Sequence, residues 1–187
     1  MKICKLAFLL LFPFLFSCNQ AVEIPKAIKD NFSGEWKSKE SISMGGNIVC
    51  CYNSGDRMLA ETIKIAEQAD FLTIEASSSF PGTAPVTSQE KLTFDGQASE
   101  INYGPERGKE STVKLSDDGQ TMTVNSIVHL MVPTPYHVDV QEQLFVYVTE
   151  VWKLSDDGKS ITVQAKAKSN TFGEDGRSWK TVFYKTN

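Results

Sequence analysis

The sequence feature that most constrains the fold is a strand, turn and strand pattern that occurs twice. Residues 145–154 are rich in β-branched and aromatic side chains, residues 155–158 form a Ser-Asp-Asp-Gly turn cluster, and residues 160–168 alternate between apolar and polar side chains. A two-residue period is typical of a strand with one buried and one exposed face. The same turn sequence occurs thirty-nine residues earlier, at 116–119. The chain is therefore predicted to be a meander of β-hairpins.

The rest of the chain extends this pattern without a convincing long helix. Residues 57–69 fit a helical period, but the near-symmetric pattern around residues 68–70 favours a hairpin. An Asp-Gly pair at 95–96, which supplies a tight hairpin turn, separates strands expected at 91–94 and 100–103. An open meander leaves two strand edges unpaired. We predict an all-β fold, an antiparallel up-and-down meander of about 8–10 strands closed as a barrel.

The first 17 residues are predicted to be a signal peptide. Lys2 and Lys5 precede an apolar run at 6–16, which is too short to span a hydrocarbon core of about 30 Å as a helix. The sequence Leu-Phe-Ser-Cys that ends the run resembles the lipobox of bacterial lipoproteins. That resemblance implies that Cys18 carries acyl chains such as palmitate and anchors the chain to a bacterial membrane, with the outer membrane as the expected site. An ordinary secretory signal with an incidental cysteine is the alternative.

The expected domain organisation is a lipidated tether at 18–31 and a barrel domain at 32–187. Without Lys2 and Lys5, 17 of the 19 basic side chains remain against 23 acidic ones, a net charge of −6. An acidic chain without basic clusters argues against a nucleic-acid partner and against electrostatic docking on anionic lipid. The membrane is therefore expected as a partner only through Cys18.

The start of the first expected strand carries a family resemblance. Gly34 and Trp36 resemble the Gly-x-Trp motif of lipocalins and fatty-acid-binding proteins, in which the glycine permits a sharp bend into the barrel and the indole closes its narrow end. In that superfamily a basic residue near the last strand packs over the tryptophan, and Arg177 occupies a comparable place. The resemblance implies a lipocalin-like barrel closed by these three residues. The C-terminal helix of lipocalins and the internal arginine and tyrosine set of fatty-acid-binding proteins are not recognisable.

Aromatic side chains on the expected strands define the candidate ligand site. Alternation places about half of such side chains inside a barrel, and a barrel wider than eight strands can enclose a small molecule. We predict non-catalytic binding of a small apolar or amphipathic ligand in the barrel. The alternative is a protein-interaction module of the cell envelope with a packed barrel and no ligand. The candidate ligand-binding residues are Trp36, Phe94, Tyr103, Phe145, Tyr147 and Trp152.

Patterns for catalysis or metal binding are weak. Cys50 and Cys51 are adjacent, and a redox or metal role lacks a Cys-x-x-Cys spacing. His129 and His137 flank a proline-containing break, and a metal site there needs a further ligand such as Asp139. The Asp-Asp-Gly turns fit turn chemistry better than a calcium loop. No enzyme motif is present, so we expect no catalysis, no cofactor and no metal.

Overall fold

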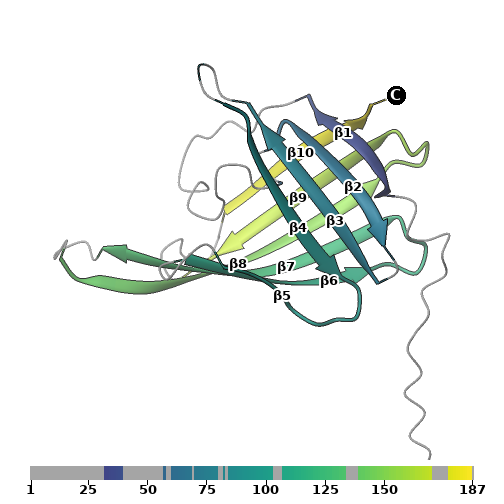
Figure 1. Cartoon of the computed structure of the whole chain (residues 1–187). Coiled ribbons are helices and arrows are strands. Elements are labelled where there is room, and N and C mark those ends of the chain that lie inside the picture. The colour runs from purple at the N-terminus through teal and green to yellow at the C-terminus, as the bar shows by residue number, and fades with distance from the viewer. Residues whose placement is uncertain are drawn as a thin grey trace, which may run out of the picture.

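Ten strands make up the fold (Figure 1). The structure is a computed structural model, and it describes residues 32–39, 57, 60–68, 70–79, 82, 84–102, 107–133, 139–169 and 177–186. The expected signal peptide and tether, with Cys18, lie outside the described residues. The strands are β1 Gly34–Ser38, β2 Thr62–Gln68, β3 Phe71–Ser78, β4 Val86–Thr93, β5 Ser99–Asn102, β6 Arg107–Leu115, β7 Thr121–Pro133, β8 Gln141–Leu154, β9 Ser160–Lys168 and β10 Arg177–Lys185.

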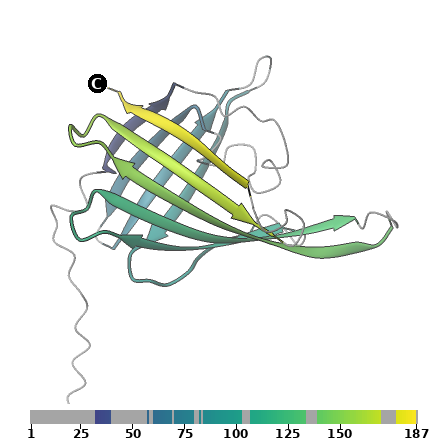
Figure 2. The ribbon, with the colours of Figure 1, turned by 180° about the vertical axis from the view of Figure 1, so that it is seen from behind.

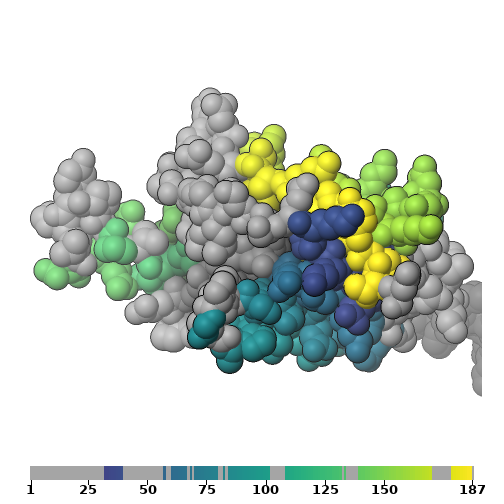
Figure 3. Space-filling view, turned by 90° about the horizontal axis from the view of Figure 1, so that it is seen from above, coloured from purple at the N-terminus to yellow at the C-terminus, as the bar shows by residue number. Residues whose placement is uncertain are grey.

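The strands form one antiparallel sheet that curls into a nearly closed barrel. Their order is β4-β3-β2-β1-β10-β9-β8-β7-β6-β5, so the first and last strands are neighbours. Trp36 pairs with Lys185, and Figure 3 shows β1 (purple) beside β10 (yellow). The edges of the sheet are β4 and β5, which approach each other without a backbone ladder. The predicted all-β, up-and-down barrel is confirmed, with one unsealed seam between β4 and β5.

The position of this seam corrects one expectation. Gly96 has the positive φ, 76°, that the Asp-Gly turn requires. However, β4 pairs along eight residues with β3, and the four-residue β5 pairs with β6. Near the seam, the Thr93 amide donates to the Ser99 hydroxyl at 3.4 Å and the Thr93 hydroxyl donates to the Gln97 carbonyl at 3.3 Å, so each of these bonds involves a side chain. The expected hairpin between these strands is therefore wrong, because each strand completes its ladder with its other neighbour.

The two alternatives for residues 57–69 are resolved in favour of the hairpin. β2 and β3 pair in register from Thr62 opposite Ser77 to Gln68 opposite Phe71. Ile63 and Ile65 are buried, and the residues between and beside them are not. This two-residue burial period leaves no room for a helix over these positions.

The duplicated turn sequence folds twice into the same structure. Gly119 and Gly158 have φ of 68° and 66°, in the left-handed region that favours glycine. In each turn the serine hydroxyl donates to the second aspartate, Asp118 or Asp157, at 2.6 Å. The first amide of the following strand donates to the serine oxygen at 2.9 Å. These local bonds fix both turns and so fix the register of β6 with β7 and of β8 with β9.

The inward side chains of all strands but β5 contribute to a continuous buried cluster. No helix in the described parts of the chain has the length and apolar character needed to cross a membrane. β7 and β8 continue past the last paired residues of β6 and β9, and Figures 1 and 2 show this green hairpin extending beyond the barrel. The largest fully buried side chains are Trp36, Trp152, Arg57, Phe32, Lys109, Phe183, Ile63, Leu72, Ile74, Leu92 and Met122.

Trp36→Ala tests whether the indole supports the barrel. Truncation of a fully buried aromatic side chain leaves a cavity, and we expect the free energy of unfolding to fall by about 3–5 kcal/mol. Urea unfolding followed by circular dichroism measures this change. Tyr184→Ala, at a 40% exposed position on the adjacent strand, is the control and should cost less than about 1 kcal/mol. Equal losses of unfolding free energy in the two variants would contradict the supporting role of the Trp36 indole.

Acid should weaken the duplicated turns. The hydrogen bond from Ser116, and after it the Gln120 amide, lowers the pKa of Asp118 below its ordinary 3.8. A carboxylate with a lowered folded-state pKa contributes stability above 3.8 and loses it as the pH falls through the lower value. We therefore expect the stability difference between wild type and Asp118→Asn to shrink below pH 3.8. Urea unfolding over a pH series measures it, and a stability difference that stays constant across pH 3.8 would contradict this role of Asp118.

Candidate functional site

Trp36 is buried beside the C-terminal end of the last strand. The indole is 0% exposed, and its Nε1 donates to the Phe32 carbonyl at 3.1 Å. The Lys185 ammonium lies 5.1 Å from the ring centroid, within the range of a cation–π contact. Gly34 has φ of 137°, and a Cβ at this position would lie 2.8 Å from Lys185 Cε. The positive φ therefore favours glycine at this position, and a larger residue would also displace the end of the Lys185 side chain from its place over the indole.

The basic residue over Trp36 is Lys185, and this corrects the expectation for Arg177. Arg177 begins β10 and pairs with Ala167, whereas Lys185 ends β10 and pairs with Trp36. Eight residues of strand separate the two positions, about 26 Å. Antiparallel pairing thus puts Arg177 at the other end of the barrel, where it cannot close the end that holds Trp36.

The six aromatic candidates do not form one site. Trp36 and Trp152 are fully buried, and Trp152 stacks on Phe183 with ring centroids 6.4 Å apart. Phe94 packs against the core from the end of β4, and Tyr103 lies outside the described residues.

Two of the six lie on the outer face of the barrel. Phe145 and Tyr147 are 44% and 57% exposed, because they alternate with the buried Val146 and Val148 on β8. Their assignment to an interior ligand site is therefore corrected. In the sequence, odd-numbered and even-numbered positions of this stretch are both apolar. Alternation alone therefore did not reveal which side chains point inward.

The barrel interior also contains a buried charge network that the sequence analysis missed. Arg57, from the segment before β2, is 0% exposed and forms a bidentate ion pair with Glu150 of β8. Its Nε donates to Glu150 Oε2 at 3.0 Å and its Nη2 to Oε1 at 2.8 Å. The Trp152 indole donates to the same Oε2 at 2.9 Å. Glu150 is thus held by three donors, a geometry that makes a buried carboxylate tolerable.

The network continues across the seam of the barrel. Arg57 also forms an ion pair with Glu90 of β4, and Glu90 pairs with Lys109 of β6 at 3.3 Å. Both Glu90 and Lys109 are buried. Two cations and two anions therefore neutralise one another inside the barrel. Side chains bridge β4 to β6 where the backbone ladder is missing.

A sequence signal for this network existed. Glu150 falls in phase with the apolar residues Val146, Val148 and Trp152 on the inward side of β8. A charged residue in phase with a buried face needs a partner inside the protein, because an unpaired buried charge costs several kcal/mol. The identity of that partner, Arg57, depends on the tertiary structure.

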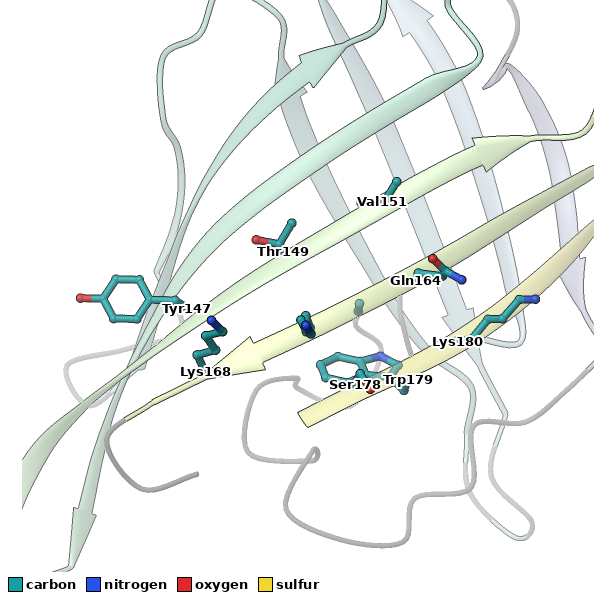
Figure 4. Close-up of a pocket in the computed structure, with 10 residues that line it drawn as sticks. Tyr147, Thr149, Val151, Gln164, Lys168, Ser178, Trp179 and Lys180 are labelled. Atoms are coloured by element: carbon teal, nitrogen blue, oxygen red, sulfur yellow. The ribbon is translucent and has the colours of Figure 1, made fainter. Parts of the chain in front are cut away.

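A depression lies on the outer face of β8, β9 and β10 (Figure 4). Its volume is about 780 Å³, and it is open to solvent. All of its lining residues except Ala165 and Trp179 occupy outward positions of these strands. Figure 4 shows Lys168 beside Tyr147, its partner across β8 and β9, and Lys180 farther along on β10. The lining residues are Tyr147, Thr149, Val151, Gln164, Ala165, Lys166, Lys168, Ser178, Trp179 and Lys180.

This outer face is basic although the chain is acidic. Lys166, Lys168 and Lys180 border the depression, and the described outward positions 145–153 of β8, 160–168 of β9 and 178–184 of β10 hold no carboxylate. Within the described part of the chain, these three lysines make no ion pair or hydrogen bond. The expectation that the chain lacks a basic cluster is therefore wrong, because strand pairing gathers lysines that the sequence separates.

A second, smaller depression of about 290 Å³ adjoins the first one. It lies on the outer face of β6, β7 and β8 and shares Tyr147 and Thr149 with the first. Ile127, 39% exposed, pairs across the strands with Tyr147 and gives this depression an apolar side chain. The two depressions make one continuous outer surface centred on β8.

The described residues form no group that could hold a metal ion. No group of three histidine, cysteine, aspartate or glutamate side chains gathers among them. His129 packs over Gly108 on the neighbouring strand, where any Cβ would clash with its ring. Cys50, Cys51 and His137 lie outside the described residues.

Comparison with known proteins adds no relative. No protein-family model, curated protein or solved structure matches this chain. The likeness to lipocalins therefore depends on the Gly34 and Trp36 motif and on the meander, and it stays a prediction.

Arg57→Met tests the charge network. The change leaves two buried carboxylates with fewer donors, and we expect the free energy of unfolding to fall by about 3–5 kcal/mol. Adding Glu150→Gln should recover part of that loss, because one uncompensated charge is removed. Lys64→Met, at an exposed position on β2, is the control for loss of a positive charge. Urea unfolding measures all three, and an Arg57→Met protein as stable as the control would contradict the network's role.

Proposed function

We propose that this chain is a non-catalytic binding module of the cell envelope, anchored by a lipidated Cys18, with the outer membrane as the expected site. In this proposal the barrel is a rigid support, and binding takes place on its outer face. The observation that carries the proposal is the contrast between the interior and the outer surface. The inward apolar side chains form one buried cluster, while the depression bordered by Lys166, Lys168 and Lys180 lies on the outer face.

The interior chemistry supports this division of roles. Trp36 and Trp152 are fully buried, and the internal charges of Arg57, Glu90, Lys109 and Glu150 are matched to one another. A ligand that entered this region would have to displace packed side chains or replace a partner of a buried charge, and both are costly. The outer face imposes neither cost.

The outer face has the chemistry of a binding surface. Tyr147 and Phe145 expose aromatic area that most soluble proteins bury, and three lysines stand beside them. A depression of about 780 Å³ is large enough to hold a substantial group. Exposed aromatic side chains are enriched at surfaces that a partner covers, and unpaired lysines favour a partner of negative charge.

A small apolar or amphipathic ligand inside the barrel remains the second candidate. Its support is the ten-strand circumference, larger than the eight that side chains just fill, and the buried indole of the Gly-x-Trp motif. Native mass spectrometry of protein purified from its own host separates the two proposals. A retained small molecule supports the interior site, and the same spectrum reports whether Cys18 is acylated.

Lysine footprinting in the cell envelope tests outer-face binding and does not require that the partner be identified first. In intact envelopes we expect an amine-reactive reagent to label Lys166, Lys168 and Lys180 several-fold less than in the purified protein. Lys64 and Lys91, at exposed outward positions of β2 and β4, are internal controls and should be labelled equally in both samples. Mass spectrometry of the digested protein measures each site.

Equal labelling of the three outer-face lysines in envelopes and in purified protein would refute the proposal. Loss of labelling at all lysines, the controls included, would also count against it, because such a pattern reports poor reagent access and not a specific face.

A further inference from the structure

We propose that the outer face of β8, β9 and β10 docks on the anionic lipid headgroups of the membrane to which the chain is tethered. This inference rests on the proposed function and names the partner of its binding surface. The docking surface is defined as the outward positions 145–153 of β8, 160–168 of β9 and 178–184 of β10.

The first argument is the spacing of the lysines. Lys166 and Lys168 are two residues apart on β9 and therefore project from the same face, about 7 Å apart. Lys180 pairs with Gln164, so it is a diagonal neighbour of Lys166, at about 7–8 Å. Like charges at this spacing repel one another, and no described outward carboxylate on these strands offsets them. An anionic partner relieves that repulsion.

The second argument is the set of exposed rings on the same surface. Tyr147 lies at the edge of the depression and is 57% exposed, and Phe145 follows at the next outward position of β8. Tyr184, also exposed, carries Lys39 over its ring at 4.3 Å. Aromatic rings with neighbouring lysines are enriched where proteins meet the headgroup region of a bilayer.

The third argument is the distribution of charge over the whole chain. The chain carries 23 acidic against 19 basic side chains, so its average interaction with an anionic surface is repulsive. A basic face on an acidic body favours the orientation in which that face meets the anionic surface. Each lysine close to an anionic membrane contributes about a fivefold factor to binding, and three contribute about two orders of magnitude.

The tether permits this orientation. The described chain begins at Phe32, next to Trp36. The residues between Cys18 and Phe32 span at most roughly 45 Å when extended. That length lets a barrel anchored at Cys18 lie on its side against the bilayer, and the anchor keeps the docking surface at a high local concentration.

A soluble acidic protein is the competing partner for such a surface. Lysines present flexible point charges, whereas planar, paired recognition of fixed carboxylates favours arginine. The described outward positions of the docking surface contain lysine and no arginine. This composition fits a mobile layer of headgroups better than a fixed set of carboxylates.

The test uses the full lipidated protein reconstituted in vesicles of phosphatidylcholine alone or mixed with phosphatidylglycerol. We expect amine-reactive labelling of Lys166, Lys168 and Lys180 to fall at least about fivefold in the anionic vesicles, the factor of one lysine at such a surface. Labelling of Lys64 and Lys91 should not change. Salt at about 1 M, where the screening length is about 3 Å, should restore the labelling.

Charge reversal supplies the matched variants. A protein with Lys166→Glu, Lys168→Glu and Lys180→Glu should lose the protection of Lys153, which lies on the same surface. A control with Lys64→Glu, Lys91→Glu and Lys114→Glu changes the total charge equally on β2, β4 and β6 and should keep it.

Two results would overturn membrane docking. One is equal labelling of the three lysines in neutral and anionic vesicles. The other is protection by soluble polyphosphate without any protection by anionic vesicles. If the same lysines are nevertheless protected in host envelopes, the outer face still binds a partner and only its identity as lipid is wrong.

Discussion

The buried ion-pair network of Arg57, Glu90, Lys109 and Glu150 is the interaction on which the barrel depends. Every other neighbouring pair of strands is joined by backbone hydrogen bonds, but β4 and β5 are not. The network spans that gap, because Arg57 connects β8 to β4 and Glu90 connects β4 to β6. Its four charges cancel, which removes most of the cost of burying them. Side-chain ion pairs therefore hold the barrel together at the seam between β4 and β5, and backbone hydrogen bonds hold all other neighbouring strands together.

Filling the interior in this way has a consequence for function. Trp36 is buried under Lys185, Trp152 stacks on Phe183, and the charge network occupies the region near the seam. Packing of the core restricts only the inward residues of each strand. The outward residues of the same strands can therefore vary in chemistry. On β8, β9 and β10 those positions hold lysines and exposed rings, and this is why the proposed function is assigned to the outer face.

The duplicated turns explain why that outer face is well defined. Each turn fixes the register of its hairpin through the same serine and aspartate bonds. This matters because a one-residue slip would exchange the inward and outward faces of a strand. The second turn joins β8 to β9 and so determines that Thr149 pairs with Lys166, while the pairing of β10 with β9 places Ser178 on the other side of Lys166. A local turn motif thereby controls which side chains meet on a surface about 30 Å long.

The sequence by itself determined the elements that depend on near neighbours. The number of strands, the duplicated turns and the β2–β3 hairpin follow from periodicity and turn residues, which act over a few positions, whereas the burial of Trp36 was expected from the Gly-x-Trp resemblance. The tertiary structure alone decided which distant strands meet. It set the seam at β4 and β5, placed Lys185 over Trp36 in place of Arg177, brought Arg57 to Glu150 across 93 residues, and gathered Lys166, Lys168 and Lys180 on one face. The physical reason is that alternation specifies two faces for each strand, whereas the order and register of the strands around the barrel decide which faces become neighbours.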